Sequence, residues 1–380
     1  MGGPLAGVTV VEVAGLGPGP FCGMLLADLG ADVIRVDRKD PSGMFAASSQ
    51  PFDVLARGRR SIAVDLKHPE GAEVVLRLVE RADAMFEGMR PGVAERLGIG
   101  PDSCLARNPA LVYGRMTGWG QEGPWAGMSG HDIDYIALTG MLDAIGPRGG
   151  APVPPLNLVG DFGGGGLMLA FGLLAGILHA RATGEGQVVD AAMVDGAATL
   201  GAMIFGLRAA GQWSGGRGEN LLDGGAPFYG VYETSDGGHM AVGALEPQFY
   251  AALLAGLGFP AEDASDQWTT TLWQTTRERF AARFRSRTRD EWTEVFVGTD
   301  ACVAPILSMG EVGGHPHMAA RGTIVEVGGI PQPAPAPRFS RTSSDPPEAP
   351  RAPGSATRDV LEWAGFTVDE QARLAGVGVL

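Results

Sequence analysis

The pattern of apolar and polar positions divides the chain into a first part, in which short apolar runs alternate with helices, and a second part that is mainly helical. β-Branched runs at Val8 to Val13 and Val33 to Val36 flank a helical pattern from Phe21 to Leu29. The alternation continues with a strand at 61–64, a helix at 69–81 and strands at 84–86 and 111–116. This order predicts an α/β fold with a large Rossmann-like parallel sheet.

The pattern after residue 166 predicts a smaller α+β domain and two connecting segments. It contains helical stretches at 167–181 and 191–210, an extended piece at Val188 and Val189, a hairpin at 231–234 and 239–242, helices at 246–257, 267–285 and 289–297, a tether at 331–353 with eight of the 27 prolines, and a last helix at 359–374. We therefore expect a large coenzyme-binding α/β domain at 1–187, a helical connector at 188–225, a small α+β domain at 226–322, and a return tether and C-terminal helix at 323–380 that pack on the large domain.

Composition and charge narrow the classes of partner. The net charge of −14 argues against nucleic acid or an anionic membrane. The cysteines, Cys22, Cys104 and Cys302, share no close spacing, so we expect no disulfide framework, no metal site and a reducing cytoplasm. The longest apolar run, Leu167 to His179, contains two glycines and is shorter than the ~20 residues of a membrane span, so we expect no membrane segment.

A glycine-rich turn, Gly15 to Pro20, follows the first strand and imitates a dinucleotide-binding fingerprint. Proline replaces the third glycine, and Pro18 and Pro20 lack the N–H group that would face a pyrophosphate. The sequence therefore disfavours a nicotinamide cofactor.

Residues 35–67 carry seven basic against four acidic side chains, a local excess of +3 in an acidic protein. This patch is either an ordinary solvated surface or a binding site for phosphates. Its position at the carboxyl ends of predicted strands favours the phosphate site.

Two motifs carry candidate acid/base groups. Met116 to Gln121 leads to Gly130-His131-Asp132, and Asn157 to Phe162 leads to four glycines at 163–166. His131 is a half-buried structural histidine or a base in a first helical turn, and Asp161 is a helix N-cap or a second base. The four glycines predict close backbone approach and suggest amide donors for an oxyanion.

These motifs, together with 27–38, 57–61, 64–67 and 90–93, resemble the racemase branch of the class III CoA-transferase and α-methylacyl-CoA racemase superfamily, over the whole chain. The resemblance implies that His131 and Asp161 are the two bases and that Asn157 and Tyr135 line their pocket. It also implies an interlocked homodimer in which Glu246, otherwise a simple first-turn acid, comes from the partner to orient the histidine.

The resemblance further implies which residues hold coenzyme A, the part of the substrate that carries the phosphates. The implied contacts are Arg38, Val64, Asp65, Leu66, Lys67, Gly88, Met89, Arg90 and Arg96. No separate cofactor and no metal are implied.

The leading prediction is a cofactor-independent isomerase of lipid metabolism that interconverts (2R)- and (2S)-2-methylacyl-CoA thioesters through His131 and Asp161. One alternative is a CoA-transferase in which Asp161 is the nucleophile. A second is an acyl-CoA-binding protein without catalysis, which needs only the basic patch.

Overall fold

The computed structural model describes residues 2–39 and 52–380, which form two compact units. Unit 1 contains Met1–Thr139, Leu156–Leu200 and Met318–Leu380, and unit 2 contains Gly140–Pro155 and Gly201–His317. The division differs from the predicted boundaries. Residues 188–200, expected in the connector, belong to unit 1, and residues 140–155, expected in the large domain, belong to unit 2. Part of the stretch between the second and third strands, residues 40–51, lies outside the described residues.

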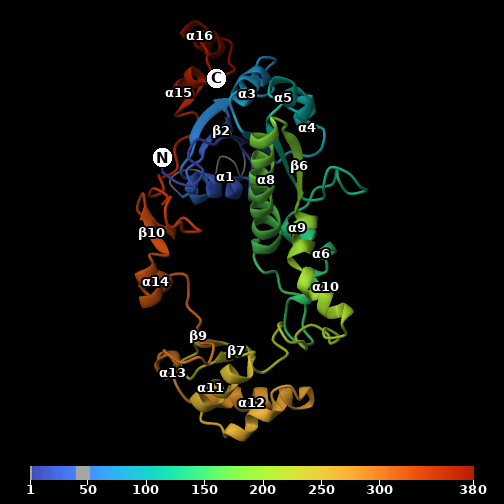
Figure 1. Cartoon of the computed structure of the whole chain (residues 1–380), viewed down its shortest axis with the longest axis vertical. Helices are drawn as coiled ribbons and strands as arrows, with labels where there is room; N and C mark the ends of the chain where they lie inside the picture. The colour runs from blue at the N-terminus through green and yellow to red at the C-terminus, as the bar shows by residue number, and fades with distance from the viewer. Residues whose placement is uncertain (1, 40–51) are drawn as a thin grey trace. The chain divides into compact units, whose positions relative to one another are not determined.

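Unit 1 is built on a six-stranded parallel sheet with the order β3-β2-β1-β4-β5-β6, which confirms the predicted α/β class. Two of its strands, β2 and β6, are labelled in Figure 1. Its strands are β1 (Thr9–Val13), β2 (Asp32–Arg38), β3 (Arg60–Val64), β4 (Ala84–Glu87), β5 (Val112–Thr117) and β6 (Gln187–Ala192). Successive strands are added on one side of β1 up to β3 and on its other side from β4 onward, so the strand order reverses between β1 and β4. Ligands of open α/β sheets bind at such a switch point.

Helices cover both faces of this sheet. Alternate strand residues, such as Val10 and Val11, point to opposite faces, and each face packs against its own helices. One face meets α3 (Gly71–Val79), α5 (Pro101–Arg107), α15 (Thr357–Trp363) and α16 (Val368–Gly376), and the other meets α1 (Pro18–Asp28) and α8 (Met168–Thr183). Among the described residues, this unit also contains η1 (Val54–Ala56), α4 (Val93–Arg96), α6 (Asp132–Leu138), the π-helix η2 (Leu158–Leu167) and α9 (Met193–Leu200).

The helices η2 and α8 form one continuous segment of 26 residues, Leu158–Thr183, with a mean hydropathy of 1.6 in its most apolar window. The expectation that no segment is long enough to span a bilayer is therefore wrong, because the four glycines extend the helix instead of interrupting it. Length and composition alone would allow a span, and 44% of the window is buried inside the protein.

Unit 2 has a three-stranded antiparallel sheet covered by helices. Its strands are β7 (Tyr229–Glu233), β8 (His239–Gly243) and β9 (Val303–Pro305), and β7 and β8 confirm the expected hairpin. Its helices are α7 (Met141–Ala144), α10 (Ala202–Ala209), α11 (Pro247–Leu257), η3 (Ala261–Asp266), η4 (Thr270–Leu272), α12 (Trp273–Phe284), α13 (Arg289–Phe296) and η5 (Val312–Gly314). Aromatic residues of α12 and α13, including Phe280, Phe284 and Trp292, fill the core.

The C-terminal segment is more structured than a tether. After α14 (Pro316–Arg321) it forms an antiparallel pair, β10 (Ile324–Val327) and β11 (Ile330–Pro333), before the extended residues that lead to α15. Gln332 is buried and its Oε1 accepts a hydrogen bond from Arg57 at 2.8 Å, which fixes this hairpin to the rest of unit 1.

Candidate active site in unit 1

The residues expected to hold the coenzyme gather at the carboxyl edge of the parallel sheet. Arg38 ends β2, residues 64–67 end and follow β3, and Gly88 to Arg90 follow β4. Arg96 ends α4, the next helix. The four cations of the set, Arg38, Lys67, Arg90 and Arg96, are exposed, as residues that meet a soluble anion must be.

A small cavity of about 100 Å³ opens beside the first strand at this edge. Gly15 and Gly17 line it from the turn after β1, and Arg35, Asp37 and Arg38 line it from β2. Gly17 has a φ of 65°, a left-handed conformation that favours glycine. The glycine-rich turn therefore forms a wall of the cavity.

The basic patch is only partly available to a ligand. Arg57 is 1% exposed and pairs with Asp28 at 2.5 Å, and Arg59 is 3% exposed and pairs with Glu12 at 2.9 Å. Arg35 and Arg60 also have carboxylate partners, Asp37 and Asp32. Reading the whole patch as a phosphate site is therefore wrong, because buried acids from upstream strands and helices neutralise the motif at 57–61.

His131 lies at the start of α6, as its N-cap, one residue before the first turn in which it was expected. The Asp134 carboxylate accepts a hydrogen bond from the His131 backbone N–H at 2.9 Å and fixes this start. The imidazole is exposed, so His131 is not the half-buried structural histidine that was the simpler interpretation.

Asp161 is inside the π-helix η2 rather than at a helix N-cap. Its Oδ2 accepts a hydrogen bond from Asn157 Nδ2 at 3.0 Å, and its backbone N–H donates to Asp132 Oδ1 at 2.7 Å. Burial raises the pKa of the Asp161 carboxyl and the Asp132 charge adds to this, while Asn157 and the imidazole of His131 oppose it. The hydrogen bond to Asp132, the neighbour of His131, thus joins Asp161 to the start of α6, as a shared site requires.

Asp161 also lies next to the carboxyl edge of the sheet, where the coenzyme is expected to bind (the coenzyme edge). A Cβ atom added at Gly17 would lie 3.0 Å from Asp161 Oδ2. The same glycine lines the cavity that contains Arg38. The carboxyl group and the expected phosphate-binding region are therefore joined through one turn.

Tyr135 packs against the loop at 118–130 that leads to His131 (the histidine loop). Its ring lies edge-on to Trp119 with 4.8 Å between ring centroids, and its hydroxyl donates to the carbonyl oxygen of Gly130. Burial, with the charges of Asp161 and Asp134, raises the pKa of Tyr135 to about 12. A Cβ atom at Gly118 would lie 2.1 Å from this ring, which explains the glycine in the first motif.

The four glycines at 163–166 have a packing role. A Cβ atom at Gly164 would lie 2.6 Å from the backbone nitrogen of Ala197, and one at Gly166 would lie 2.5 Å from the carbonyl oxygen of Pro18. Their amides lie in the interior of a π-helix, where N–H groups donate to carbonyls five residues earlier. Their use as oxyanion donors is therefore not supported.

Glu246 lies in unit 2, where it is the exposed N-cap of α11. Its carbonyl oxygen accepts the N–H groups of Phe249 and Tyr250 at 3.0 and 2.9 Å. Unit 1 thus brings together His131, Tyr135, Asn157 and Asp161, whereas Glu246 belongs to a separate unit.

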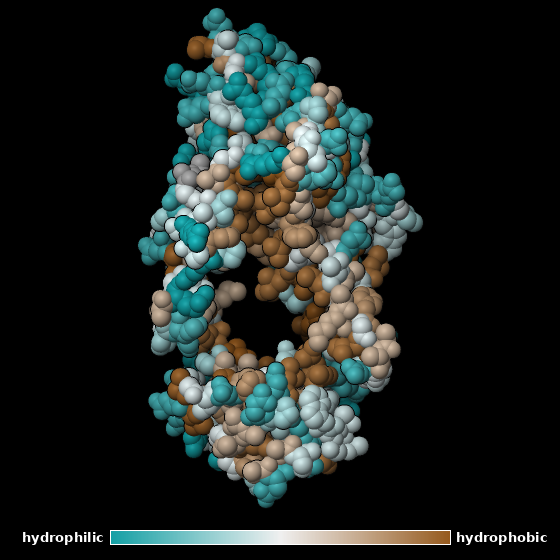
Figure 2. All heavy atoms as spheres, viewed as in Figure 1, coloured by the Kyte–Doolittle hydropathy of each residue, from teal (hydrophilic) through white to brown (hydrophobic). Residues whose placement is uncertain are grey.

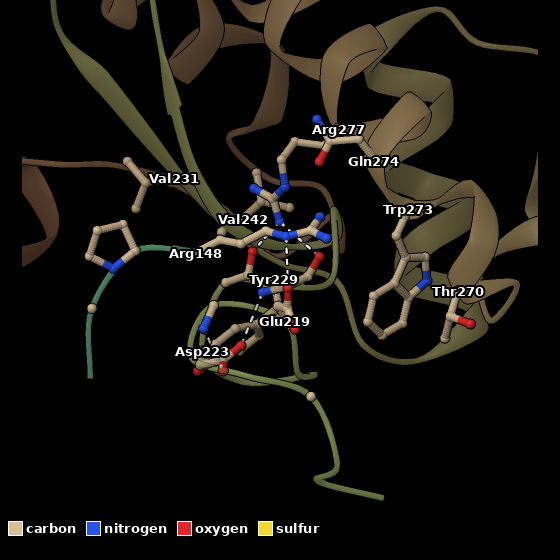
Figure 3. A pocket seen from close by; sticks show the side chains of 18 of the residues that line it. Arg148, Glu219, Asp223, Tyr229, Val231, Val242, Thr270, Trp273, Gln274 and Arg277 are labelled. Carbon is tan, nitrogen blue, oxygen red and sulfur yellow. Dashed lines mark hydrogen bonds and ion pairs between the residues drawn. The ribbon is translucent and has the colours of Figure 1, made fainter. Parts of the chain in front are cut away.

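Unit 2 contains a second cavity, of about 1420 Å³, that none of the expected site residues line. Figure 3 shows Arg277 extending into it from α12. One nitrogen of this guanidinium donates to the carbonyl oxygens of Gly224, Gly225 and Ala226, and so holds the loop before β7. No motif in the sequence pointed to this cavity.

Sequence reasoning also missed two polar links within the site. Asp132 was quoted only as the neighbour of His131, although its side chain contacts the backbone of Asp161. Ser129 accepts a hydrogen bond from Arg90 at 2.6 Å and connects the coenzyme edge to the histidine loop. Both links join residues about 30 or more positions apart, which a local pattern does not reveal.

Comparisons with known proteins identify relatives of the chain. The model of CoA-transferase family III matches residues 5–356. A curated α-methylacyl-CoA racemase of Mus musculus is 46% identical over 373 residues, which cover 97% of this chain and 96% of that protein. The human α-methylacyl-CoA racemase is 45% identical over 370 residues, which cover 96% and 94%.

A similar fold is present in the crystal structure of a CaiB/BaiF family protein from Brucella suis. The TM-score is 0.79 at 24% sequence identity, and the match covers 96% of this chain and all of the other, 100%. At this identity the match supports the fold alone.

Proposed function

Because the chain belongs to CoA-transferase family III, we propose that it is an isomerase that interconverts (2R)- and (2S)-2-methylacyl-CoA thioesters. The observation that carries this proposal is that Asp161, beside the carboxyl edge of the sheet, is hydrogen-bonded to Asp132, the residue directly after the exposed His131. The racemase relatives, at 45–46% identity, support the same reaction.

The reaction needs two groups that exchange one proton each with the α-carbon. One base removes the α-proton and leaves an enolate, and the other returns a proton to the opposite face. The raised pKa of Asp161 suits this task, since the group holds a proton more readily than an ordinary carboxyl and is a stronger base without it. The thioester activates the α-proton, so the proposed reaction uses no metal and no separate cofactor.

CoA transfer is the alternative from another reaction class. The name of the matching family favours it, and Asp161 would then be a nucleophile that forms an acyl anhydride. His131 separates the two reactions, because a transferase that uses Asp161 in this way has no need of a second base. Binding of acyl-CoA without catalysis would need neither group.

Deuterium incorporation tests the proposal. The purified protein is incubated with an (S)-2-methylacyl-CoA in D₂O without an acceptor acid, and we expect label at the α-carbon of both epimers. His131→Ala and Asp161→Ala each abolish interconversion while affinity for free CoA stays within about threefold, and exposed His317→Ala is the control. CoA movement only after an acceptor acid is added, without α-label, identifies a transferase instead.

We further propose that two chains form a homodimer in the cytoplasm and that Glu246 of the partner subunit orients His131. Exposed apolar side chains along α8 support association, and the free cysteines Cys22, Cys104 and Cys302 fit a reducing compartment. The expected partners are an acyl-CoA substrate and a second copy of the chain.

A further inference from the structure

Asp132 joins the two helices that carry His131 and Asp161. It is the first residue of α6, directly after His131, and it is 6% exposed. Its Oδ1 accepts a hydrogen bond from the Asp161 backbone N–H at 2.7 Å, across 29 positions of sequence. The two proposed bases are therefore connected by one side chain and two short pieces of backbone.

The contact is close enough to define the spacing of the two helices. A Cβ atom added at Gly160 would lie 2.5 Å from Asp132 Oδ1 and 3.2 Å from the Asp132 carbonyl oxygen. Only glycine at position 160 lets the π-helix approach the carboxylate this closely. The glycine before Asp161 and the aspartate after His131 are thus two halves of one contact.

The same carboxylate also acts on Asp161 through its charge. Burial makes the largest contribution to the pKa of Asp161 and raises it, and the hydrogen bond from Asn157 opposes this effect. The negative charge of Asp132 on α6 raises the pKa further. The other ionisable groups around this pair are His131, Tyr135, Asp134 and Arg90. A change at Asp132 therefore has a geometric effect and an electrostatic effect that can be measured separately.

We infer that Asp132 is a positioning residue: its buried carboxylate fixes the separation between the start of α6, which carries His131, and the π-helix, which carries Asp161. The inference rests on the proposed function, since it assigns Asp132 a role in setting the distance between the two bases. Displacement of a reacting group by about 1 Å can reduce a rate about 10²-fold.

Three variants separate geometry from charge. Asp132→Ala removes the acceptor, Asp132→Asn keeps an acceptor oxygen without the charge, and Asp369→Ala removes an exposed acid from the first turn of α16 as the control. For each, kcat and KM for α-deuterium exchange, affinity for free CoA and the pH profile of kcat are measured. We expect Asp132→Ala to reduce kcat about 10²-fold with CoA affinity within about threefold, while Asp132→Asn keeps kcat within about tenfold.

The charge effect gives a readout that a purely structural role would not move. In Asp132→Asn we expect the acid limb of the kcat profile to shift to lower pH, because Asp161 loses a negative neighbour. Wild-type kcat in Asp132→Ala, or an unshifted limb in Asp132→Asn, overturns the inference. If the wild-type protein exchanges no deuterium, the proposed function has failed instead.

A titration that does not depend on activity covers that case. The protein is labelled with [¹³Cγ]aspartate, and the Asp161 signal is identified from its loss in Asp161→Asn. A lower Asp161 pKa in Asp132→Asn than in the wild type supports the link, and equal values overturn it.

Discussion

Among single residues, Glu87 is a buried carboxyl group next to the expected coenzyme site, and its surroundings change its pKa. It ends β4, directly before Gly88 to Arg90, and is 1% exposed. Burial raises its pKa to about 7, although the Met89 N–H donates to its Oε2 at 2.5 Å and Arg115 lies 3.5 Å from its Oε1. The segment expected to contact coenzyme thus starts at a carboxyl group that titrates near neutral pH.

Glu87→Gln should remove a pH dependence of stability. The folded protein holds this proton more tightly than the unfolded chain, so the stabilisation is present below pH 4.5 and is lost as the pH rises through about 7. As the pH rises over that range, we expect the free energy of unfolding of the variant to increase relative to that of the wild type, by about 3 kcal/mol at most. Urea unfolding at pH 5 to 8 measures this difference.

Glu362→Gln, at an exposed position of α15, controls for the loss of one negative charge. A constant difference between Glu87→Gln and the wild type at every pH would contradict the prediction, because the linkage requires a change with pH.

Among helices and strands, the packing of η2 against α9 depends on glycines from both. A Cβ atom at Gly196 of α9 would lie 1.9 Å from the Gly164 carbonyl oxygen. By contrast, a Cβ atom at Gly19 of α1 would lie 3.7 Å from Phe86, an ordinary van der Waals distance. The two positions therefore tolerate a methyl group very differently.

We expect Gly196→Ala to lower the free energy of unfolding by about 3 kcal/mol, because overpacking against backbone cannot be relieved by a side-chain rotation. Gly19→Ala should change it by less than about 1 kcal/mol, in the stabilising direction. Denaturant unfolding of both variants tests this pair. Equal effects would show that η2 and α9 can separate without loss of stability.

The strands of the sheet were largely predictable because each is a short apolar run between turn residues. The expected strand at 61–64, for example, became β3 (Arg60–Val64). The exception is β6, which was expected only as an extended piece in a connector. Its first residues are exposed at the edge of the sheet, so they lack the continuous apolar run that identified the others.

The candidate site was predictable where chemistry follows from residue type, and not where it follows from packing. His131, Asp161 and the glycine-flanked loops stood out in the sequence, and the structure gathers them in unit 1. The π-helix did not stand out, because four consecutive glycines favour a loop, and the close packing of Gly164 and Gly166 against α9 and α1 is not visible in a local pattern. Arg57 and Arg59 were misread because their partners, Asp28 and Glu12, lie 29 and 47 positions away.

For the whole molecule, the exposed apolar side of α8 indicates an interaction surface. Leu167, Phe171 and Leu178 are 52%, 70% and 72% exposed, and with Leu174 they form a stripe at helical spacing. Figure 2 shows apolar side chains gathered over α8 on the visible face of unit 1. Such a patch on a single chain is typical of an interface.

The paired substitution Phe171→Glu and Leu178→Glu should therefore convert a dimer into a monomer, and analytical ultracentrifugation should show half the wild-type mass. Met309→Glu, at an 87% exposed position, is the control and should leave the mass unchanged. A wild-type protein that sediments as a monomer contradicts the dimer. Wild-type flotation with phosphatidylcholine vesicles would assign the stripe to a bilayer instead.

The return of the C-terminal segment to unit 1 affects how this protein is made. Val379 is fully buried, and its carbonyl oxygen accepts the N–H of Asp65 at 2.8 Å, while two oxygens of Ser61 accept the N–H groups of Gly354 and Ala356. The first sheet to leave the ribosome thus stays unfinished until residues as far along the chain as Val379 have been translated. A nascent chain of this protein must remain soluble with an open core while unit 2 is made, and a stop before Gly354 would leave that core permanently uncovered.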